Sequence, residues 1–250
     1  NYRGVPFLEF SSDGSFAGID IGLSSSKSFL FSIFQGAHQD NKRFVNTLGN
    51  SNGVLLELND NIQKSVISYQ LGVTKDNSNL LGISSVGGFG ESEKSTTSFL
   101  GIELFNKFHD FLFRSSLHIG QTSSKFNQSG MIKGTDDAYF SSFDLGLYKE
   151  NIFFNGDSLG IQVYQPLRSE LASMNLNLPV GRTKDKKILF KEIDLDLTPS
   201  GRQINSQLIY RKNSRYLSFF GKLGLVSNEF HEEEGKVKPY FQLDIEFNLE

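Results

Sequence analysis

The sequence contains no cysteine and no tryptophan, and its 250 residues include only 5 prolines and 2 methionines. Without cysteine the chain can form no disulfide, no thiolate metal site and no cysteine nucleophile. Its 25 basic residues stand against 28 acidic ones, a balance that disfavours a domain binding nucleic acid through phosphate contacts. No apolar run approaches the roughly 18 residues of a membrane-spanning helix, although membrane-spanning strands would escape that criterion.

Apolar and polar residues alternate along most of the chain, with the period of two that marks a strand with unlike faces. No segment of useful length shows the three- and four-residue spacing of an amphipathic helix. The clearest alternation lies near the C-terminus, where Gln242, Asp244 and Glu246 separate four apolar residues. These four are Phe241, Leu243, Ile245 and Phe247.

This alternation predicts twelve strands, a strand content above that of ordinary soluble domains. Two of the predicted strands change phase midway, 158–178 near Pro166 and 190–211 across residues 199–201. A proline within a strand indicates an edge or a bulge, so we expect a bulge at each phase change. The twelve strands are 5–10, 15–23, 27–35, 53–59, 63–75, 96–107, 110–122, 138–150, 158–178, 190–211, 215–227 and 238–247.

The connections between these strands are short on one side and mostly long on the other, as in antiparallel outer-membrane barrels. We therefore expect one domain over 1–250, an antiparallel 12-stranded transmembrane β-barrel. Residues 1–14 form its N-terminal strand or entry segment, and 76–95 form a long extracellular loop. The N-terminal residues lack the segments of a signal peptide, which is typical of a processed product or an excised domain.

A soluble β-sandwich or ligand-binding barrel shows the same alternation, but its apolar face points inward. Long strands, recurring Phe and Tyr and two-sided connections favour the membrane barrel, whose polar face lines a lumen. Twelve strands predict a narrow, wet lumen that accommodates one helix or an extended chain. The charged residues and the histidine expected to line it are Asp20, Glu57, Glu103, Arg114, His118, Asp144, Arg168, Glu192, Asp194, Asp196, Arg211, Lys222, Asp244 and Glu246.

Five sequence blocks resemble the C-terminal translocator barrel of autotransporters (type V secretion), specifically the subtilisin-like serine protease autotransporters of Gram-negative bacteria. The similarity covers roughly residues 80–247. Its blocks are GGFG (87–90), TTSFLG (96–101), LGIQVYQPLR (159–168), LNLPVGR (176–182) and IDLDLTPSGR (193–202).

This resemblance implies an outer-membrane barrel, with an N-terminal helix through its pore, that exports and anchors a passenger at the cell surface. It implies three partners: outer-membrane lipid and lipopolysaccharide, the barrel-assembly machinery and the passenger itself. The assembly signal corresponds to Phe241, Leu243, Ile245 and Phe247. The chain departs from the family in two respects: no helix precedes residue 5, and Gly134-Thr135 is followed by Asp136 where the protease motif has serine.

We expect the chain to be neither an enzyme nor a cofactor or metal protein. Its four histidines, at 38, 109, 118 and 231, lack metal-ligand spacing. The acidic ladder Glu192, Asp194 and Asp196 could bind a divalent cation, but such a ladder is more often a solvated strand face. A stand-alone porin-like or structural barrel is the main alternative to a translocator, and a soluble sandwich or ligand-binding barrel is the third.

Overall fold

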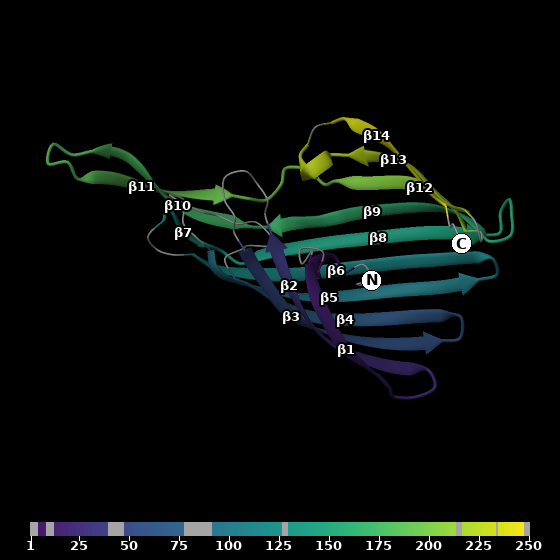
Figure 1. The fold of residues 1–250 in the computed structure, drawn as a ribbon. Coiled ribbons are helices and arrows are strands. Elements are labelled where there is room, and N and C mark those ends of the chain that lie inside the picture. Colours follow the sequence, from purple (N-terminus) through teal and green to yellow (C-terminus); the bar gives the residue numbers. More distant parts are fainter. Residues whose placement is uncertain are drawn as a thin grey trace.

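The computed structural model describes residues 5–8, 13–39, 48–77, 92–126, 130–213, 217–233 and 235–247. Over these residues the protein is all-β, with antiparallel strands arranged in two sheets (Figure 1). No helix among them is long and apolar enough to cross a membrane.

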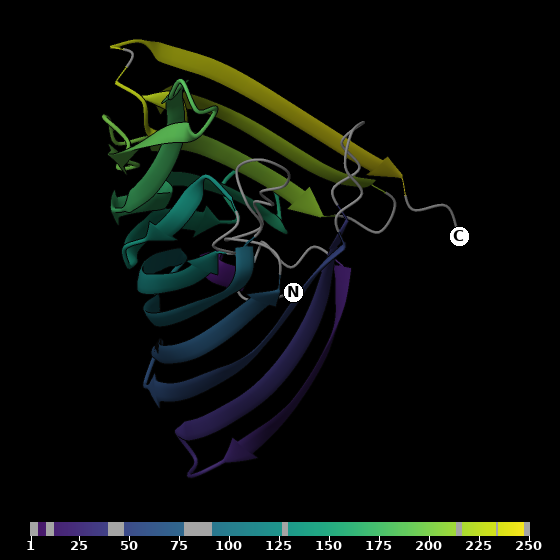
Figure 2. The same cartoon turned by 90° about the vertical axis from the view of Figure 1, so that its left-hand side faces the viewer.

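Eleven described strands form the main sheet, in the order β1-β2-β3-β4-β5-β6-β8-β9-β12-β13-β14. The sheet curls strongly, so that it has a concave and a convex face, with β1 and β14 at its two open edges (Figure 2). Its strands are β1 (Asp13–Gly22), β2 (Lys27–Gln39), β3 (Leu48–Ile62), β4 (Ser65–Asn77), β5 (Ser92–Phe108), β6 (Phe111–Phe126), β8 (Ala138–Glu150), β9 (Asp157–Leu171), β12 (Ile204–Asn213), β13 (Leu217–Ser227) and β14 (Val237–Phe247).

A second, three-stranded sheet has the order β11-β10-β7. Its strands are β7 (Ile132–Thr135), β10 (Ser173–Arg182) and β11 (Ile188–Asp196). The β10–β11 hairpin extends beyond the main sheet (Figure 1). It begins where β9 ends, because Ala172 separates the two strands.

The expected closed 12-stranded barrel is therefore wrong in both strand count and closure. The predicted strand 158–178 is divided between β9 and β10, and 190–211 between β11 and β12. The phase change predicted as a bulge across 199–201 marks instead the passage of the chain from β11 of one sheet to β12 of the other, whereas β9 passes into β10 at Ala172. The connection 197–203 lies outside any strand, consistent with the missing N–H of Pro199.

The bulge predicted near Pro166 is confirmed. Ser141 pairs with Arg168 and Phe143 with Gln165, so β9 contributes an extra residue between these pairs. Pro166 lies within this irregularity, where its lack of a backbone donor removes no regular ladder bond.

The predicted N-terminal strand 5–10 is also wrong. Pro6–Leu8 form a short 3-10 helix, η1, and residues 9–12 lie outside the described part of the chain. Val5, Phe7 and Leu8 are buried in a cluster with three apolar residues of the main sheet. The rings of Phe7 and Phe99 are stacked with their centroids 5.0 Å apart. The three sheet residues are Phe34, Leu55 and Phe99.

Short connections join the strands at one end of the main sheet, as at residues 63–64 and 109–110. Of the loop predicted over 76–95, only 76–77 and 92–95 are described, and they belong to β4 and β5. The connections at the other end are longer, and one of them contains the whole projecting hairpin.

Candidate functional site

The two faces of the main sheet have opposite chemistry. Along β4, Ser68, Gln70 and Thr74 are buried, while Tyr69 and Leu71 between them are exposed. Neighbouring strands repeat this pattern, so buried polar residues line the concave face and large apolar residues cover the convex face. Exposed apolar residues of the convex face include Ile19, Ile33, Val54, Leu71, Leu100, Leu117, Ile119, Leu145, Ile161, Leu208, Leu223 and Phe241.

A polar network crosses the concave face from β3 to β6. The Gln70 amide donates to Glu57 over 3.3 Å, and the Gln70 carbonyl oxygen lies 3.0 Å from His118 Nε2. His118 Nε2 also lies 3.9 Å from Glu103. Asn59 donates to the other oxygen of Glu57 over 2.8 Å. Because most of these buried groups bond to one another, the concave face can remain polar at low solvent exposure, although His118 Nδ1 has no hydrogen-bond partner among the described residues.

A second network links β8, β9, β12 and β14. Gln162 donates to Asp144, and its own carbonyl oxygen accepts from Gln207 over 2.7 Å. The Tyr240 hydroxyl donates to Gln207 over 2.5 Å. The hydroxyl of Tyr148 approaches Gln162 at 3.3 Å. A cavity of about 490 Å³ lies against this part of the wall, and η1 contributes Pro6 to its lining.

The close packing of the concave face depends on glycine at Gly101. A Cβ atom built there would lie 2.5 Å from the His118 ring and 2.7 Å from the Gln70 carbonyl oxygen. The absent side chain therefore leaves the space in which His118 reaches Gln70.

The structure places most of the predicted lumen residues on the concave face, with unequal burial. Glu57, Glu103 and His118 are 1% exposed. Arg168 does not lie on the concave face, which corrects its assignment to the lumen: beyond the bulge it pairs with Ser141, which lies on the convex face with Ile119. Residues nearer the open edges of the sheet are more exposed than those in its middle. Partly buried are Arg114, Asp144 and Lys222, and exposed are Asp20, Arg211, Asp244 and Glu246.

Asp194 and Asp196 do not lie on the concave face, which corrects their assignment to the lumen. Together with Glu192 they belong to β11 of the projecting hairpin and are exposed. The prediction failed because it extended the strand period through residues 197–203, where the chain changes sheets. The backbone N–H of Thr198 donates to Asp196 over 2.8 Å and holds the pKa of this carboxyl group below its usual range.

The predicted assembly signal lies on β14, which among the described strands pairs with β13 alone. Phe241, Leu243 and Ile245 are 68%, 45% and 50% exposed and belong to the convex face. Phe247 ends the strand opposite Leu217. The signalling role of these residues stays a prediction.

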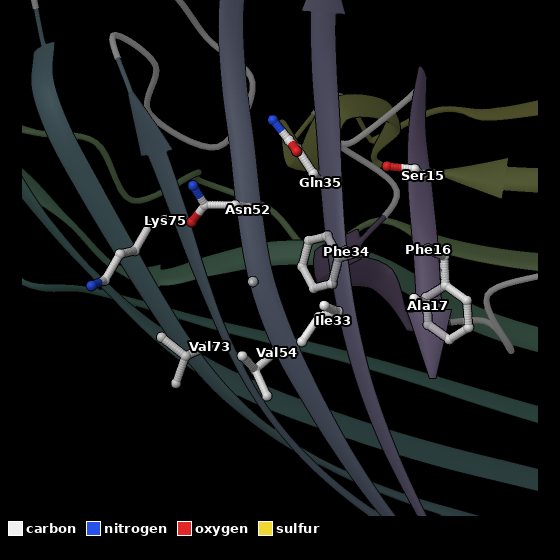
Figure 3. A pocket seen from close by; sticks show the side chains of 11 residues that line it. Ser15, Phe16, Ala17, Ile33, Phe34, Gln35, Asn52, Val54, Val73 and Lys75 are labelled. Atoms are coloured by element: carbon white, nitrogen blue, oxygen red, sulfur yellow. The ribbon is translucent and has the colours of Figure 1, made fainter. Parts of the chain in front are cut away.

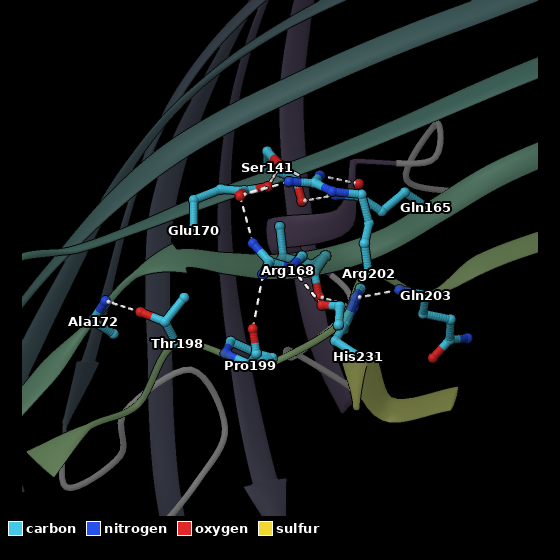
Figure 4. A network of polar contacts seen from close by, with 12 residues as sticks. Ser141, Gln165, Arg168, Glu170, Ala172, Thr198, Pro199, Arg202, Gln203 and His231 are labelled. Carbon is cyan, nitrogen blue, oxygen red and sulfur yellow. Dashed lines mark hydrogen bonds and ion pairs between the residues drawn. The ribbon is translucent and has the colours of Figure 1, made fainter. Parts of the chain in front are cut away.

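A cluster of ionic and polar side chains joins three segments at the long-connection end of the sheet (Figure 4). Arg168 donates to the carbonyls of Pro199 and Gly201, each over 2.9 Å. Arg168 and Arg202 also both bind Glu170, which anchors the connection 197–203 to β9. The arginines of the QPLR and TPSGR blocks thus meet at a single carboxylate.

His231 attaches the β13–β14 connection to the same cluster. Its Nδ1 accepts the backbone N–H of Gln203 over 3.0 Å, so Nε2 carries the proton and donates to the Leu167 carbonyl over 3.1 Å. Burial lowers the pKa of His231 below its ordinary value, and the nearby charges of Arg168 and Arg202 lower it further. His231 is therefore a neutral structural link at neutral pH.

A hollow of about 590 Å³ lies over β1–β4 where Gly53 presents no side chain (Figure 3). The ring of Phe34 occupies the space beside this glycine, since a Cβ there would approach it to 2.4 Å. Its lining is mostly apolar or uncharged, and Lys75 is its one charged residue among those described.

Sequence reasoning missed the uncharged members of the concave networks. Gln70, Gln162, Gln207 and Tyr240 all occupy inward positions of the strand period, so the alternation alone could have identified them. They carry no charge, and the prediction named only charged residues and a histidine. The pairing of Arg202 with Glu170 carried no sequence signal, because it depends on the path of the connection 197–203.

The chain matches no protein-family model, no curated protein and no solved structure. Among the described residues, no group of three or more His, Asp or Glu side chains could hold a metal ion. The geometry of the two faces is therefore the main guide to function.

Proposed function

We propose that this chain is the membrane-spanning translocator domain of an autotransporter in a bacterial outer membrane. The observation that carries the proposal is the inverted distribution of side chains over the curved main sheet. A soluble sheet buries its apolar face and presents its polar face to water. Here the polar face is buried in the middle of the sheet, and the convex face exposes one large apolar residue after another. Such a surface matches the hydrocarbon region of a bilayer.

Strand lengths agree with this environment. β4, β5, β6 and β9 have 13, 17, 16 and 15 residues, whereas a tilted spanning strand needs about 9–11. The excess extends each strand beyond the hydrocarbon region, where the Arg168–Glu170 cluster and the projecting hairpin lie.

In a membrane the edge strands β1 and β14 must also form hydrogen bonds on their outer sides, because unpaired backbone groups there would be costly in lipid. All eleven strands of the main sheet are antiparallel to their neighbours, so β1 and β14 run in the same direction. Joining them directly would create a parallel pair. One additional strand between them would complete an all-antiparallel wall, and the proposal requires such a strand in the membrane.

The N-terminal segment supports export of a passenger rather than a stand-alone channel. Val5, Phe7 and Leu8 pack on the concave face. A polypeptide attached ahead of them therefore starts inside the curve of the sheet, next to the polar cavity of about 490 Å³. Beyond the apolar contact of these residues, the polar lining of the cavity would allow an extended chain to slide without further strong apolar contacts. The sequence resemblance to autotransporter barrels is consistent with this path.

A surface-display assay tests the proposal. A signal peptide and a reporter domain are fused ahead of Asn1, and protease is added to intact Gram-negative cells. We expect protease to digest the reporter from outside while the barrel stays in the membrane fraction. A chain that enters the membrane but leaves its reporter protected would support the porin-like alternative. A chain recovered in the soluble periplasmic fraction would refute both membrane functions.

A further inference from the structure

The end of the projecting β10–β11 hairpin carries a concentrated positive charge. Residues 180–190, here called the hairpin tip, include four exposed basic side chains in the central part of the hairpin, with Asp185 as their acidic neighbour. The four basic residues are Arg182, Lys184, Lys186 and Lys187.

Bulky apolar side chains lie directly beside these charges. Val180, Ile188, Leu189 and Phe190 are 59%, 48%, 49% and 54% exposed. Leu189 and Phe190 are consecutive residues of a strand, so their side chains point to opposite faces of the hairpin. The tip is therefore apolar on both faces.

The turn of the tip is held by its own hydrogen bonds. Thr183 N–H donates to the Lys187 carbonyl over 2.9 Å, and Lys186 N–H donates to the Thr183 carbonyl over 3.0 Å. The hydroxyl of Thr183 accepts the backbone N–H of Lys187 over 3.1 Å. The basic residues are thus presented on a preformed turn, which lowers the entropy cost of binding.

The charge reverses along the hairpin. Beyond Phe190, β11 carries one more exposed basic residue, Lys191, and then the exposed acidic residues Glu192, Asp194 and Asp196. The apolar and basic zone covers about four residues per strand, or about 13 Å at the rise of a strand. This length exceeds the depth to which amphipathic elements enter a lipid interface, roughly 5–10 Å, so the zone can cover the full depth of that interface. The acidic stem would stay outside an anionic interface.

We propose that the hairpin tip binds an anionic lipid surface, with its basic side chains on lipid phosphates and its apolar side chains in the interfacial region. A lipid interface can surround both faces of the two-stranded tip, whereas a protein partner covers one face, so the two-faced apolar pattern favours lipid. Lipid binding by the tip is a property separate from translocation. It rests on the proposed function in one respect, the side of the membrane from which the hairpin extends.

A flotation assay tests this inference. The full chain is inserted into nanodiscs of pure phosphatidylcholine and mixed with vesicles of phosphatidylcholine and phosphatidylglycerol. We expect the nanodiscs to float with these vesicles, to stay behind with neutral vesicles, and to bind less as salt rises. The double variant Lys184→Gln/Lys187→Gln should bind on the order of 30-fold more weakly, given the usual contribution of a lysine near an anionic bilayer.

Two further variants separate charge from lipid insertion. The control Lys94→Gln/Lys236→Gln removes two exposed lysines at the same end of the sheet and should leave flotation unchanged. Leu189→Ser/Phe190→Ser keeps every charge and should weaken flotation at least tenfold. Full binding by this second variant would identify a polyanion site for acidic proteins or sugars and overturn the lipid proposal, as would a native chain that does not float.

Insertion into the nanodiscs is measured first. A chain that does not insert contradicts the proposed membrane function, and its flotation with the same vesicles is then measured without nanodiscs. Failure of the proposed function and failure of the hairpin inference therefore give different results.

Discussion

The replacement Leu117→Arg on the convex face distinguishes a membrane wall from a soluble sheet. Leu117 is 50% exposed and lies near the middle of β6, between the buried residues Ser116 and His118. An arginine at the midplane of a bilayer destabilises a strand barrel by about 2–4 kcal/mol. On a soluble sheet the same exposed position would change stability by less than about 0.5 kcal/mol. The two environments therefore predict effects that differ several-fold.

The chain is folded into phosphatidylcholine vesicles and titrated with denaturant. The folded fraction at each denaturant concentration is measured from the heat-dependent gel mobility of the chain. Ser123→Arg serves as the control, since Ser123 occupies the same face of β6 but lies near the long-connection end. Its expected cost is about 0–1 kcal/mol. Equal and small costs for Leu117→Arg and Ser123→Arg would refute the membrane orientation of the convex face.

Three further predictions concern the polar networks. Tyr240→Phe removes the hydroxyl that donates to Gln207 and should lower the free energy of unfolding by about 0.5–1.5 kcal/mol. An unchanged midpoint in a urea titration would show that this hydrogen bond does not stabilise the fold. Arg168→Lys keeps the charge beside Glu170 but loses two bonds to backbone carbonyls, so proteolysis of the 197–203 connection should become faster, and an unchanged cleavage rate would contradict that role. Because burial lowers the pKa of His231, the unfolded chain takes up this proton first, and the stability contribution of His231 is present above about pH 6.5 and falls as the pH drops. His231→Gln should reduce this acid-side loss in unfolding midpoints measured between about pH 5 and 7.5, and an identical pH profile would exclude the group.

The local alternation of polar and apolar residues predicted which face of each strand a side chain occupies, but not how the strands assemble into sheets. The period of two placed Gln70 and Leu71 on opposite faces, and Pro166 correctly marked a bulge. The same period could not show that Ala172 and the 197–203 connection carry the chain into a second sheet. Both the bulge and the change of sheet shift the strand phase, and only long-range pairing distinguishes them.

Closure of the sheet and the polar site were predicted to different extents. The inward position of charged residues such as Glu57 and His118 could be predicted, because it follows directly from strand parity. Asp194 was misplaced because its strand leaves the main sheet. The predicted strand 5–10 is wrong because the apolar residues at its start, Val5, Phe7 and Leu8, form a short helical turn that packs against Phe99. Whether β1 meets β14 depends on strand curvature and partners, which no local pattern encodes.

Two single-cysteine variants of this cysteine-free chain report directly which face of β6 meets lipid and which meets water. Ser116→Cys and Leu117→Cys are labelled with an environment-sensitive fluorophore after folding into vesicles. We expect nitroxide on lipid chains to quench the probe at 117, and a water-soluble quencher to reach the probe at 116. Water access at both positions, or quenching by lipid at 116 and by the water-soluble agent at 117, would contradict the expected orientation of β6.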